Sequence, residues 1–185
     1  ANGNTAVTIA WTTRHPADSS VSYGTDGYTA TVLQDTDIYT RRHTVVLSGL
    51  TPSTCYVYRV GSRDQEIGRG RFCTFKKNGE LFRFVVFGDT GYGSAGQFAV
   101  AKQIEKVHPD FLLHVGDLIY PYGQGGGYKP LFYEPYKSVI AHAYFFPTVG
   151  NHDIREDGMP PFLYHFRLPK NRVYYSFVYD NALFI

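Results

Sequence analysis

The sequence is poor in cysteine, in charge and in long apolar runs. Its 185 residues include two cysteines, which are too few for a small fold held together mainly by disulfides. Charged residues make up 18% of the chain, the formal net charge is +2, and lysine and arginine never form a run of more than two residues. A nucleic-acid partner is therefore not expected. No apolar stretch approaches the ~20 residues that a membrane-spanning helix requires, so a membrane partner is not expected either.

Apolar and aromatic residues, by contrast, are plentiful. Apolar residues make up 43% of the chain and aromatic residues 17%, with 16 tyrosines and 14 phenylalanines. This composition excludes a disordered chain. Tyrosine suits half-buried sheet surfaces and the rims of binding sites, because one end of its side chain is apolar and the other is polar. The length allows one domain or two small ones.

We expect the natural protein to extend beyond both ends of this sequence. The only methionine is Met159, and no signal-peptide pattern opens the chain. At the other end, residues 182–185 are predicted to be a strand, and a domain does not normally stop inside one.

The first 75 residues predict short strands separated by turns. Residues 6–12 alternate, with Val7, Ile9 and Trp11 on one side of the predicted strand. Turn dipeptides such as Asp26-Gly27 separate the segments, and no convincing helical period occurs. This part of the chain is therefore expected to form a β-sandwich. The other predicted strands are 20–23, 28–33, 43–47, 55–61 and 70–75.

The last two of these strands predict a hairpin that brings the two cysteines together. Pairing Cys55 with Cys73 centres the turn at residue 64, which agrees with the strand boundaries. Directly opposed cysteines can satisfy the geometry of a disulfide if they form a non-hydrogen-bonded pair. Two small buried thiols are the alternative, and the sequence leaves both open.

Two features of residues 1–76 resemble fibronectin type III domains. Trp11 lies on an early strand, and the pattern Leu50-x-Pro52-x-Thr54-x-Tyr56 leads into a later one. In this pattern Tyr56 is similar to the tyrosine corner of such sandwiches. The resemblance implies a fibronectin type III-like domain over residues 1–76.

From residue 77 onward the apolar pattern changes to that of an α/β fold. Buried strands are predicted at 82–87, 111–115 and 144–149, and helices at 94–107 and 131–143. The first helix is expected to bury Phe98, Ala101, Ile104 and Val107. Strand–helix–strand units favour parallel pairing. Residues 172–179 and 182–185 predict an antiparallel hairpin.

Each of the three predicted α/β strands ends in a loop that carries polar side chains. The first loop holds Asp89, the second Asp117 and Tyr120, and the third Asn151-His152-Asp153. The carboxyl ends of parallel strands meet at one edge of a sheet, so the loops are expected to converge. Grouped carboxylates repel one another unless a cation compensates them, which indicates a metal site.

At these residues the sequence resembles the purple acid phosphatases, within the metallophosphoesterase (calcineurin-like) superfamily. The first three of five family blocks match Asp89-Thr90-Gly91, Gly116-Asp117-x-x-Tyr120 and Gly150-Asn151-His152-Asp153. Many superfamily members carry His where Gly91 stands, and purple acid phosphatases carry the tyrosine instead. The last two blocks, Val-x-x-His and Gly-His-x-His, are absent, so we expect them after Ile185. Residues 77–185 would then be the N-terminal portion of a metallophosphoesterase domain, preceded by the sandwich.

The resemblance implies a dinuclear acid phosphatase that hydrolyses phosphate monoesters by attack of a metal-activated hydroxide. Asp89 and Tyr120 would bind Fe(III), Asp117 would bridge both metals, and Asn151 would bind a divalent ion, namely Zn, Mn or Fe. His152 would contact the phosphate and protonate the leaving group. Family members are mostly secreted or vacuolar, so an extracytoplasmic location is expected.

Several alternatives remain beside this hypothesis. The same metal pair could serve a phosphodiesterase or a nucleotide pyrophosphatase, and a metal-poor binding module is a third possibility. Asp153 is expected to orient a neighbouring group, and His114 to be a hydrogen-bonded core residue. In the glycine-rich segment 121–128, Tyr122 and Tyr128 are candidate substrate walls, although a flexible loop without chemistry is equally compatible. The sequence does not predict the oligomeric state.

Overall fold

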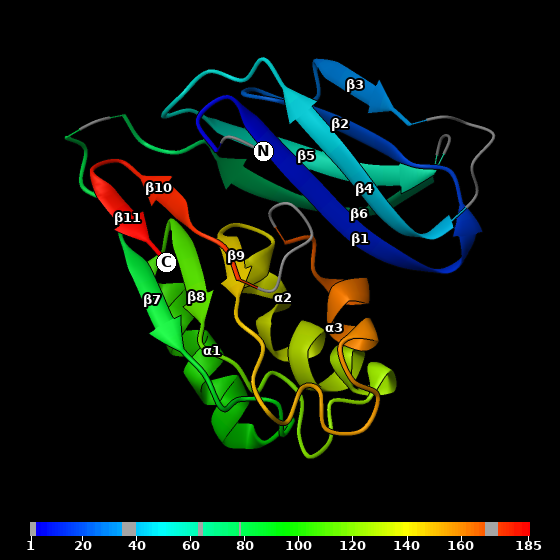
Figure 1. Cartoon of the computed structure of the whole chain (residues 1–185). Helices are drawn as coiled ribbons and strands as arrows, with labels where there is room; N and C mark the ends of the chain where they lie inside the picture. Colours follow the sequence, from blue (N-terminus) through cyan, green and yellow to red (C-terminus); the bar gives the residue numbers. More distant parts are fainter. Residues whose placement is uncertain (1–2, 35–39, 63–64, 78, 169–173) are drawn as a thin grey trace. The chain divides into compact units, whose positions relative to one another are not determined.

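The computed structural model describes residues 3–34, 40–62, 65–77, 79–168 and 174–185 (Figure 1). The chain divides into two compact units, Ala1–Glu80 and Leu81–Ile185. The first consists of β-strands, and the second combines strands with helices, so the fold is a β-sandwich followed by an α/β domain. Among the described residues, no helix is long and apolar enough to cross a membrane.

The first unit contains two antiparallel sheets. Strands β1 and β4 form one sheet, and the other has the order β3-β2-β5-β6. The alternation predicted for the first strand is confirmed, because Val7 and Ile9 are buried whereas Thr8 and Ala10 are exposed. The strands are β1 (Ala6–Ala17), β2 (Ser20–Gly24), β3 (Ala30–Leu33), β4 (Thr40–Ser48), β5 (Cys55–Ser62) and β6 (Gln65–Cys73).

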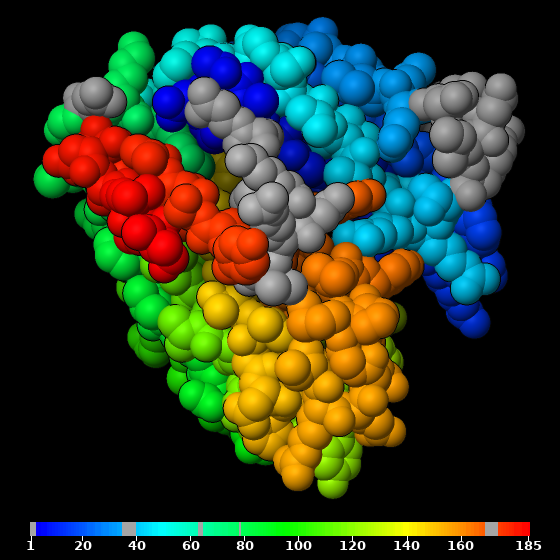
Figure 2. Space-filling model, viewed as in Figure 1, coloured from blue at the N-terminus to red at the C-terminus, as the bar shows by residue number. Residues whose placement is uncertain are grey.

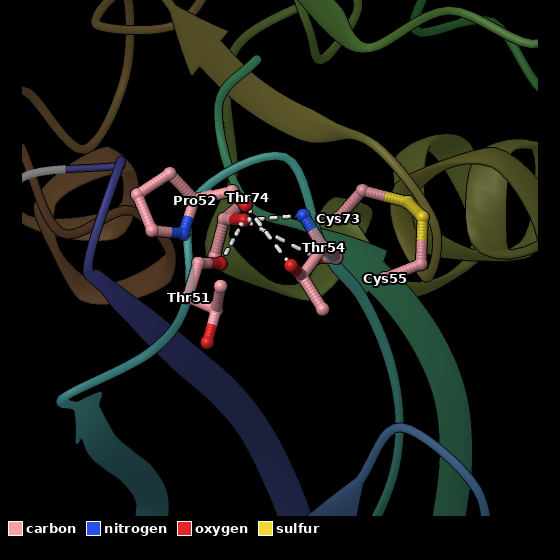
Figure 3. Close-up of a disulfide and its surroundings, with 6 residues drawn as sticks. All are labelled: Thr51, Pro52, Thr54, Cys55, Cys73 and Thr74. Carbon is pink, nitrogen blue, oxygen red and sulfur yellow. Dashed lines mark hydrogen bonds between the residues drawn. A yellow bond between two sulfur atoms is a disulfide. The ribbon is translucent and has the colours of Figure 1, made fainter. Parts of the chain in front are cut away.

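The hairpin of β5 and β6 has the predicted register, and its cysteines are joined. Cys55 lies opposite Cys73, and the two form a disulfide with Cα atoms 3.9 Å apart (Figure 3). Beside it, the Thr74 hydroxyl donates to the carbonyl of Thr51 at 2.7 Å and accepts from the Thr54 N–H at 3.0 Å. The segment that leads into β5 is therefore tied to the end of β6.

Tyr56 makes the hydrogen bond expected of a tyrosine corner. Its hydroxyl accepts from the Thr51 N–H at 2.9 Å, five residues upstream, while its ring stacks on Phe72 in the sandwich core. The resemblance of the whole unit to fibronectin type III domains stays a prediction.

In the second unit, the described strands β7, β8 and β9 form a parallel sheet in that order. The predicted strand–helix–strand arrangement is confirmed. The helix predicted at 131–143 is shorter and begins with a π-helical turn, and a helix after the third loop was not predicted. The elements are β7 (Phe84–Phe87), α1 (Ala95–Val107), β8 (Phe111–His114), η1 (Gly125–Gly127), η2 (Lys129–Tyr133), α2 (Glu134–Ile140), β9 (Tyr144–Pro147) and α3 (Pro160–His165).

The helices and a hairpin cover opposite faces of this sheet. Leu112 of β8 lies in the helix-side core with side chains of α1, α2 and α3. The neighbouring Phe111 points the other way and packs against Phe177 and Phe184 of the hairpin β10 (Phe177–Tyr179) and β11 (Ala182–Phe184). Figure 2 shows this hairpin, in red, at the surface. The predicted hairpin is confirmed over these strands, and residues 172–173 lie outside the described residues.

The buried face of α1 differs from the prediction. Ala101 and Ile104 are buried, but Phe98 and Val107 are 40% and 43% exposed. Gln97 is buried instead, because its amide is fully engaged: Oε1 accepts from the Gly93 N–H at 2.7 Å, and Nε2 donates to the Leu131 carbonyl at 2.6 Å. A buried glutamine with both ends satisfied costs little.

Candidate metal centre

The three loops predicted to carry the site leave the same edge of the sheet. Phe87, His114 and Pro147 end their strands and stand side by side in the parallel register. The backbones that follow them are joined directly, since the Asp89 N–H donates to the Gly116 carbonyl at 3.2 Å and the Thr90 N–H to the Asp117 carbonyl at 3.1 Å. The expected convergence of the loops is therefore confirmed.

The side chains of Asp89, Asp117 and Tyr120 form one cluster. The Tyr120 hydroxyl lies 2.7 Å from Asp89 Oδ1 and 2.9 Å from Asp117 Oδ2. Both aspartates have left-handed backbones, with φ of 54° and 57°, a conformation that non-glycine residues seldom adopt outside turns and functional sites. Two separate loops are thus shaped to bring carboxylates to one phenol.

Desolvation, followed by the hydrogen bonds to Asp89 and Asp117, raises the pKa of Tyr120 above its usual value. The phenol is therefore protonated in this arrangement, and its single proton faces two carboxylate oxygens. One proton cannot fully satisfy two anionic acceptors, and a cation shared by all three oxygens would do so.

The donor set fits a hard metal ion. Two carboxylates and a phenol are hard oxygen ligands, which suit Fe(III) and divalent first-row ions. Across the described parts of the chain, no group of three His, Cys, Asp or Glu side chains is close enough to hold a metal unaided. The cluster reaches three donors only because Tyr120 contributes to it.

The third loop supplies His152 and Asn151. The His152 N–H donates to Asp117 Oδ1 at 2.9 Å, and its ring lies 4.4 Å from that of Tyr120. Its Nδ1 donates to the carbonyl of Pro121 at 2.7 Å, because a carbonyl can only accept. The Nε2 atom is then the ring nitrogen that takes no part in this bond. Asn151 is exposed on the same loop, next to Gly150.

Close backbone contacts explain two of the loop glycines. A Cβ atom at Gly91 would overlap the carbonyl oxygen of Leu118, and one at Gly150 would overlap Asp117 Oδ1. The loops therefore approach more closely than any other residue would permit. At Gly91 this contact leaves no space for any larger side chain.

Two further polar residues support the loops as predicted. His114 is 1% exposed; its Nδ1 accepts from the Gly116 N–H at 3.3 Å, so its Nε2 donates to the Thr90 hydroxyl at 2.9 Å. Burial lowers the pKa of His114 to about 4, against the opposing effect of Asp89 and Asp117, so its ring is neutral. Asp153 is fully buried and also bonds to backbone rather than facing the cluster.

The structure corrects one prediction for the glycine-rich segment and adds one residue to the site. Tyr128 is fully buried and stacks on His165 at 4.0 Å, so it is not a substrate wall. Tyr122 is 42% exposed, with the Arg155 guanidinium over its ring. Tyr92, which the sequence did not single out, stacks on Tyr120 at 4.1 Å and 13°. The sequence could have indicated Tyr92, because it lies only three residues after Asp89 in the first loop.

Two family models together match almost all of the chain. Residues 82–184 match the calcineurin-like phosphoesterase family, and residues 1–76 match the purple acid phosphatase N-terminal domain. The chain therefore belongs to the calcineurin-like phosphoesterases, in the group in which a purple acid phosphatase N-terminal domain precedes the phosphoesterase domain.

Similar proteins agree with this assignment. Acid phosphatase type 7 of Mus musculus is 32% identical over 165 residues, which cover 80% of this chain and 37% of the mouse protein. The Homo sapiens protein of the same name is 29% identical, with 81% of this chain and 38% of that protein covered. The chain thus spans little more than a third of these curated relatives.

Solved structures show the same fold. A purple acid phosphatase, PPD1 from yellow lupin seeds, superposes with a TM-score of 0.78 at 20% identity, covering 95% of this chain and 41% of that one. PhoD superposes with a TM-score of 0.56 at 16% identity, covering 96% of this chain and 48% of that one.

Proposed function

We propose that this protein is a dinuclear-metal acid phosphatase that hydrolyses phosphate monoesters. The observation that carries the proposal is the placement of the Tyr120 hydroxyl within 2.9 Å of carboxylate oxygens from two different loops. Membership in the calcineurin-like phosphoesterase family and the similarity to acid phosphatase type 7 support a phosphoester as substrate.

In this proposal, Asp89 and Tyr120 would bind Fe(III), and Asn151 would bind a divalent ion such as Zn, Mn or Fe. Asp117 is suited to bridge the two metals because its oxygens face different loops. Oδ2 faces the phenol of Tyr120, and Oδ1 lies against the third loop, where it accepts from the His152 N–H. A carboxylate in this position can offer one oxygen to each of two ions.

The bound pair would supply an activated nucleophile and neutralise the charge of the phosphoryl group. The residues of the chain do the remaining work. His152 is oriented by the bond from its Nδ1 to the Pro121 carbonyl and by contact with the Tyr120 ring. Its Nε2 is the atom that would pass a proton to the leaving alkoxide.

The phenolate assignment is tested by visible absorption. A phenolate bound to Fe(III) gives a charge-transfer band, so the iron-loaded protein should be coloured. We expect Tyr120→Phe to lose the band and most of the activity, and Tyr28→Phe, which alters an exposed tyrosine of the first unit, to keep both. An iron-loaded protein without a band, or a band that survives Tyr120→Phe, would contradict the assignment.

Substrate class is tested separately, on the same metal-loaded protein. We expect a chromogenic phosphate monoester to be hydrolysed with a higher kcat/KM than the matching diester, and more rapidly at acidic pH. A preference for the diester would favour a phosphodiesterase or a nucleotide pyrophosphatase. Less than one iron per chain after reconstitution would favour a metal-poor binding module.

We also propose an extracytoplasmic location. The disulfide between Cys55 and Cys73 supports it, because such bonds persist in oxidising compartments and are rare in reducing ones. Fractionation of cells that express the natural gene, followed by thiol labelling of each fraction, tests this proposal: a protein found only in the cytosol with both thiols free would contradict it.

A further inference from the structure

Asp153 lies at the junction of the second and third loops and binds both. Its Oδ1 accepts from the N–H groups of Leu118 and Ile119, at 2.8 and 3.0 Å. Its Oδ2 accepts from the N–H of Gly150, at 2.9 Å. One carboxylate therefore joins the backbone directly after Asp117 to the backbone directly before Asn151.

Burial makes this link rigid. Asp153 has no exposed surface, and Leu118 and Ile119, whose N–H groups it accepts, are also fully buried. Three backbone donors converge on the carboxylate, and each bond has a charged acceptor, so each is stronger than a neutral hydrogen bond. Without the carboxylate, the buried N–H groups of Leu118 and Ile119 and the part-buried N–H of Gly150 would lack this acceptor, which is costly.

The same bonds explain why Asp153 is not a ligand. Both of its oxygens point toward backbone donors, whereas the clustered oxygens of Asp89, Asp117 and Tyr120 point toward one another. Asp153 is therefore placed to act on a metal through the positions of the loops that it joins rather than as a ligand.

We propose that Asp153 is a positioning residue that sets the separation between the Asp117 carboxylate and the Asn151 amide. Through this separation it would set the metal affinity of the site that the second and third loops form. This inference rests on the proposed metal centre. Residues that orient metal ligands typically change metal affinity by 10–100-fold when they are replaced.

The test compares Asp153→Asn with a matched control at the other end of the sheet. Asparagine has the same shape, but its NH2 group cannot accept a hydrogen bond. In Asp153→Asn, the backbone N–H groups of either the second or the third loop therefore face a donor instead of an acceptor. Asp110 provides the control, because its Oδ2 accepts from the Arg83 N–H at 2.8 Å near the start of β8. Asp110→Asn removes a carboxylate that also binds backbone, but it leaves the metal loops unchanged.

Two measurements are made on the natural full-length protein. In metal-free protein, we expect Asp153→Asn to speed hydrogen exchange at Leu118, Ile119 or Gly150 by about tenfold or more, and Asp110→Asn to leave these amides unchanged. In titrations with Zn²⁺ against a chromophoric chelator, we expect Asp153→Asn to weaken binding about tenfold or more and Asp110→Asn to retain the wild-type Kd. Asp153→Glu, which keeps both acceptor oxygens, should recover most of the affinity.

The outcomes separate this inference from the proposed function. Unchanged exchange in Asp153→Asn would show that the carboxylate does not hold the loops. Faster exchange with a Kd equal to that of Asp110→Asn would leave Asp153 a purely structural residue, and the inference would be wrong. If the wild-type protein binds no Zn²⁺, the proposed metal centre fails, and the positioning role fails with it, whatever the exchange rates show.

Discussion

Removing the disulfide should destabilise the first unit by about 3 kcal/mol. Cys55 and Cys73 are 18 residues apart in the sequence. In the chain-entropy description, a cross-link that closes a loop of this length removes about 11 cal/mol/K of entropy from the unfolded chain, which corresponds to about 3 kcal/mol at 25 °C. For a domain of this size, that loss lowers Tm by roughly 10–25 °C.

The folded hairpin should survive the change. The backbone pairing of β5 with β6 continues from Tyr56 opposite Phe72 along the strand, and the Thr74 hydroxyl still ties the segment before β5 to the end of β6. The variant that tests the magnitude is therefore Cys55→Ala/Cys73→Ala. It is expected to lower the free energy of unfolding with little change in fold, as judged by circular dichroism.

Trp11 makes the measurement specific to this unit. It is the only tryptophan of the chain, and it stacks on His43 at 4.8 Å. Its fluorescence during urea unfolding therefore follows the first unit alone. Reductant should reproduce the loss in the wild-type protein and have no effect on the double variant. A difference below about 1 kcal/mol would refute the entropic argument, and a difference between wild type and double variant that persists in reductant would assign the loss to packing.

Three further predictions concern packing and pH. Gly91→Ala should destabilise the second unit by about 1–3 kcal/mol, measured by urea unfolding, because the new Cβ overlaps the Leu118 carbonyl; an unchanged midpoint would contradict the contact. Burial lowers the pKa of His43 below 6.5, so the unfolded state gains the proton first and Trp11-detected stability should fall as pH drops below about 6.5; a flat profile would contradict this. The pKa of His114 is lowered in the same direction, to about 4. The free energy of unfolding of the second unit in metal-free protein should therefore fall by up to about 3 kcal/mol between pH 6.5 and 4, and His114→Asn should show a smaller fall.

Local patterns were sufficient to predict the strands and the loops that follow them. Alternation at Val7 and Ile9 and the polar residues after each parallel strand depend on short-range periodicity and on a general property of α/β sheets. The proximity of Asp89, Asp117 and Tyr120 follows from these two facts. Their roles as ligands came from the family resemblance and stay predictions.

Tertiary contacts decided the features that the sequence did not predict. Gln97 is buried on α1 in place of Phe98, because its amide bonds both to nearby Gly93 and to Leu131, which is 34 residues away. Tyr128 is buried by its contact with His165, 37 residues away, although its glycine-rich neighbours suggested an exposed loop. Tyr92 joins the site by stacking on Tyr120. None of these contacts leaves a periodic signature.

The close contact between Gly91 and the Leu118 backbone restricts which residues can occupy position 91. An imidazole ligand introduced there would first collide with the backbone at Leu118, so the second loop would have to retreat, and Tyr120 with it. A side chain at position 91 would therefore disturb the loop that carries Tyr120, whose N–H donates to the Gly91 carbonyl at 3.0 Å. We therefore expect residues 91 and 120 to change together among descendants of a common phosphoesterase, as a linked pair rather than as independent positions.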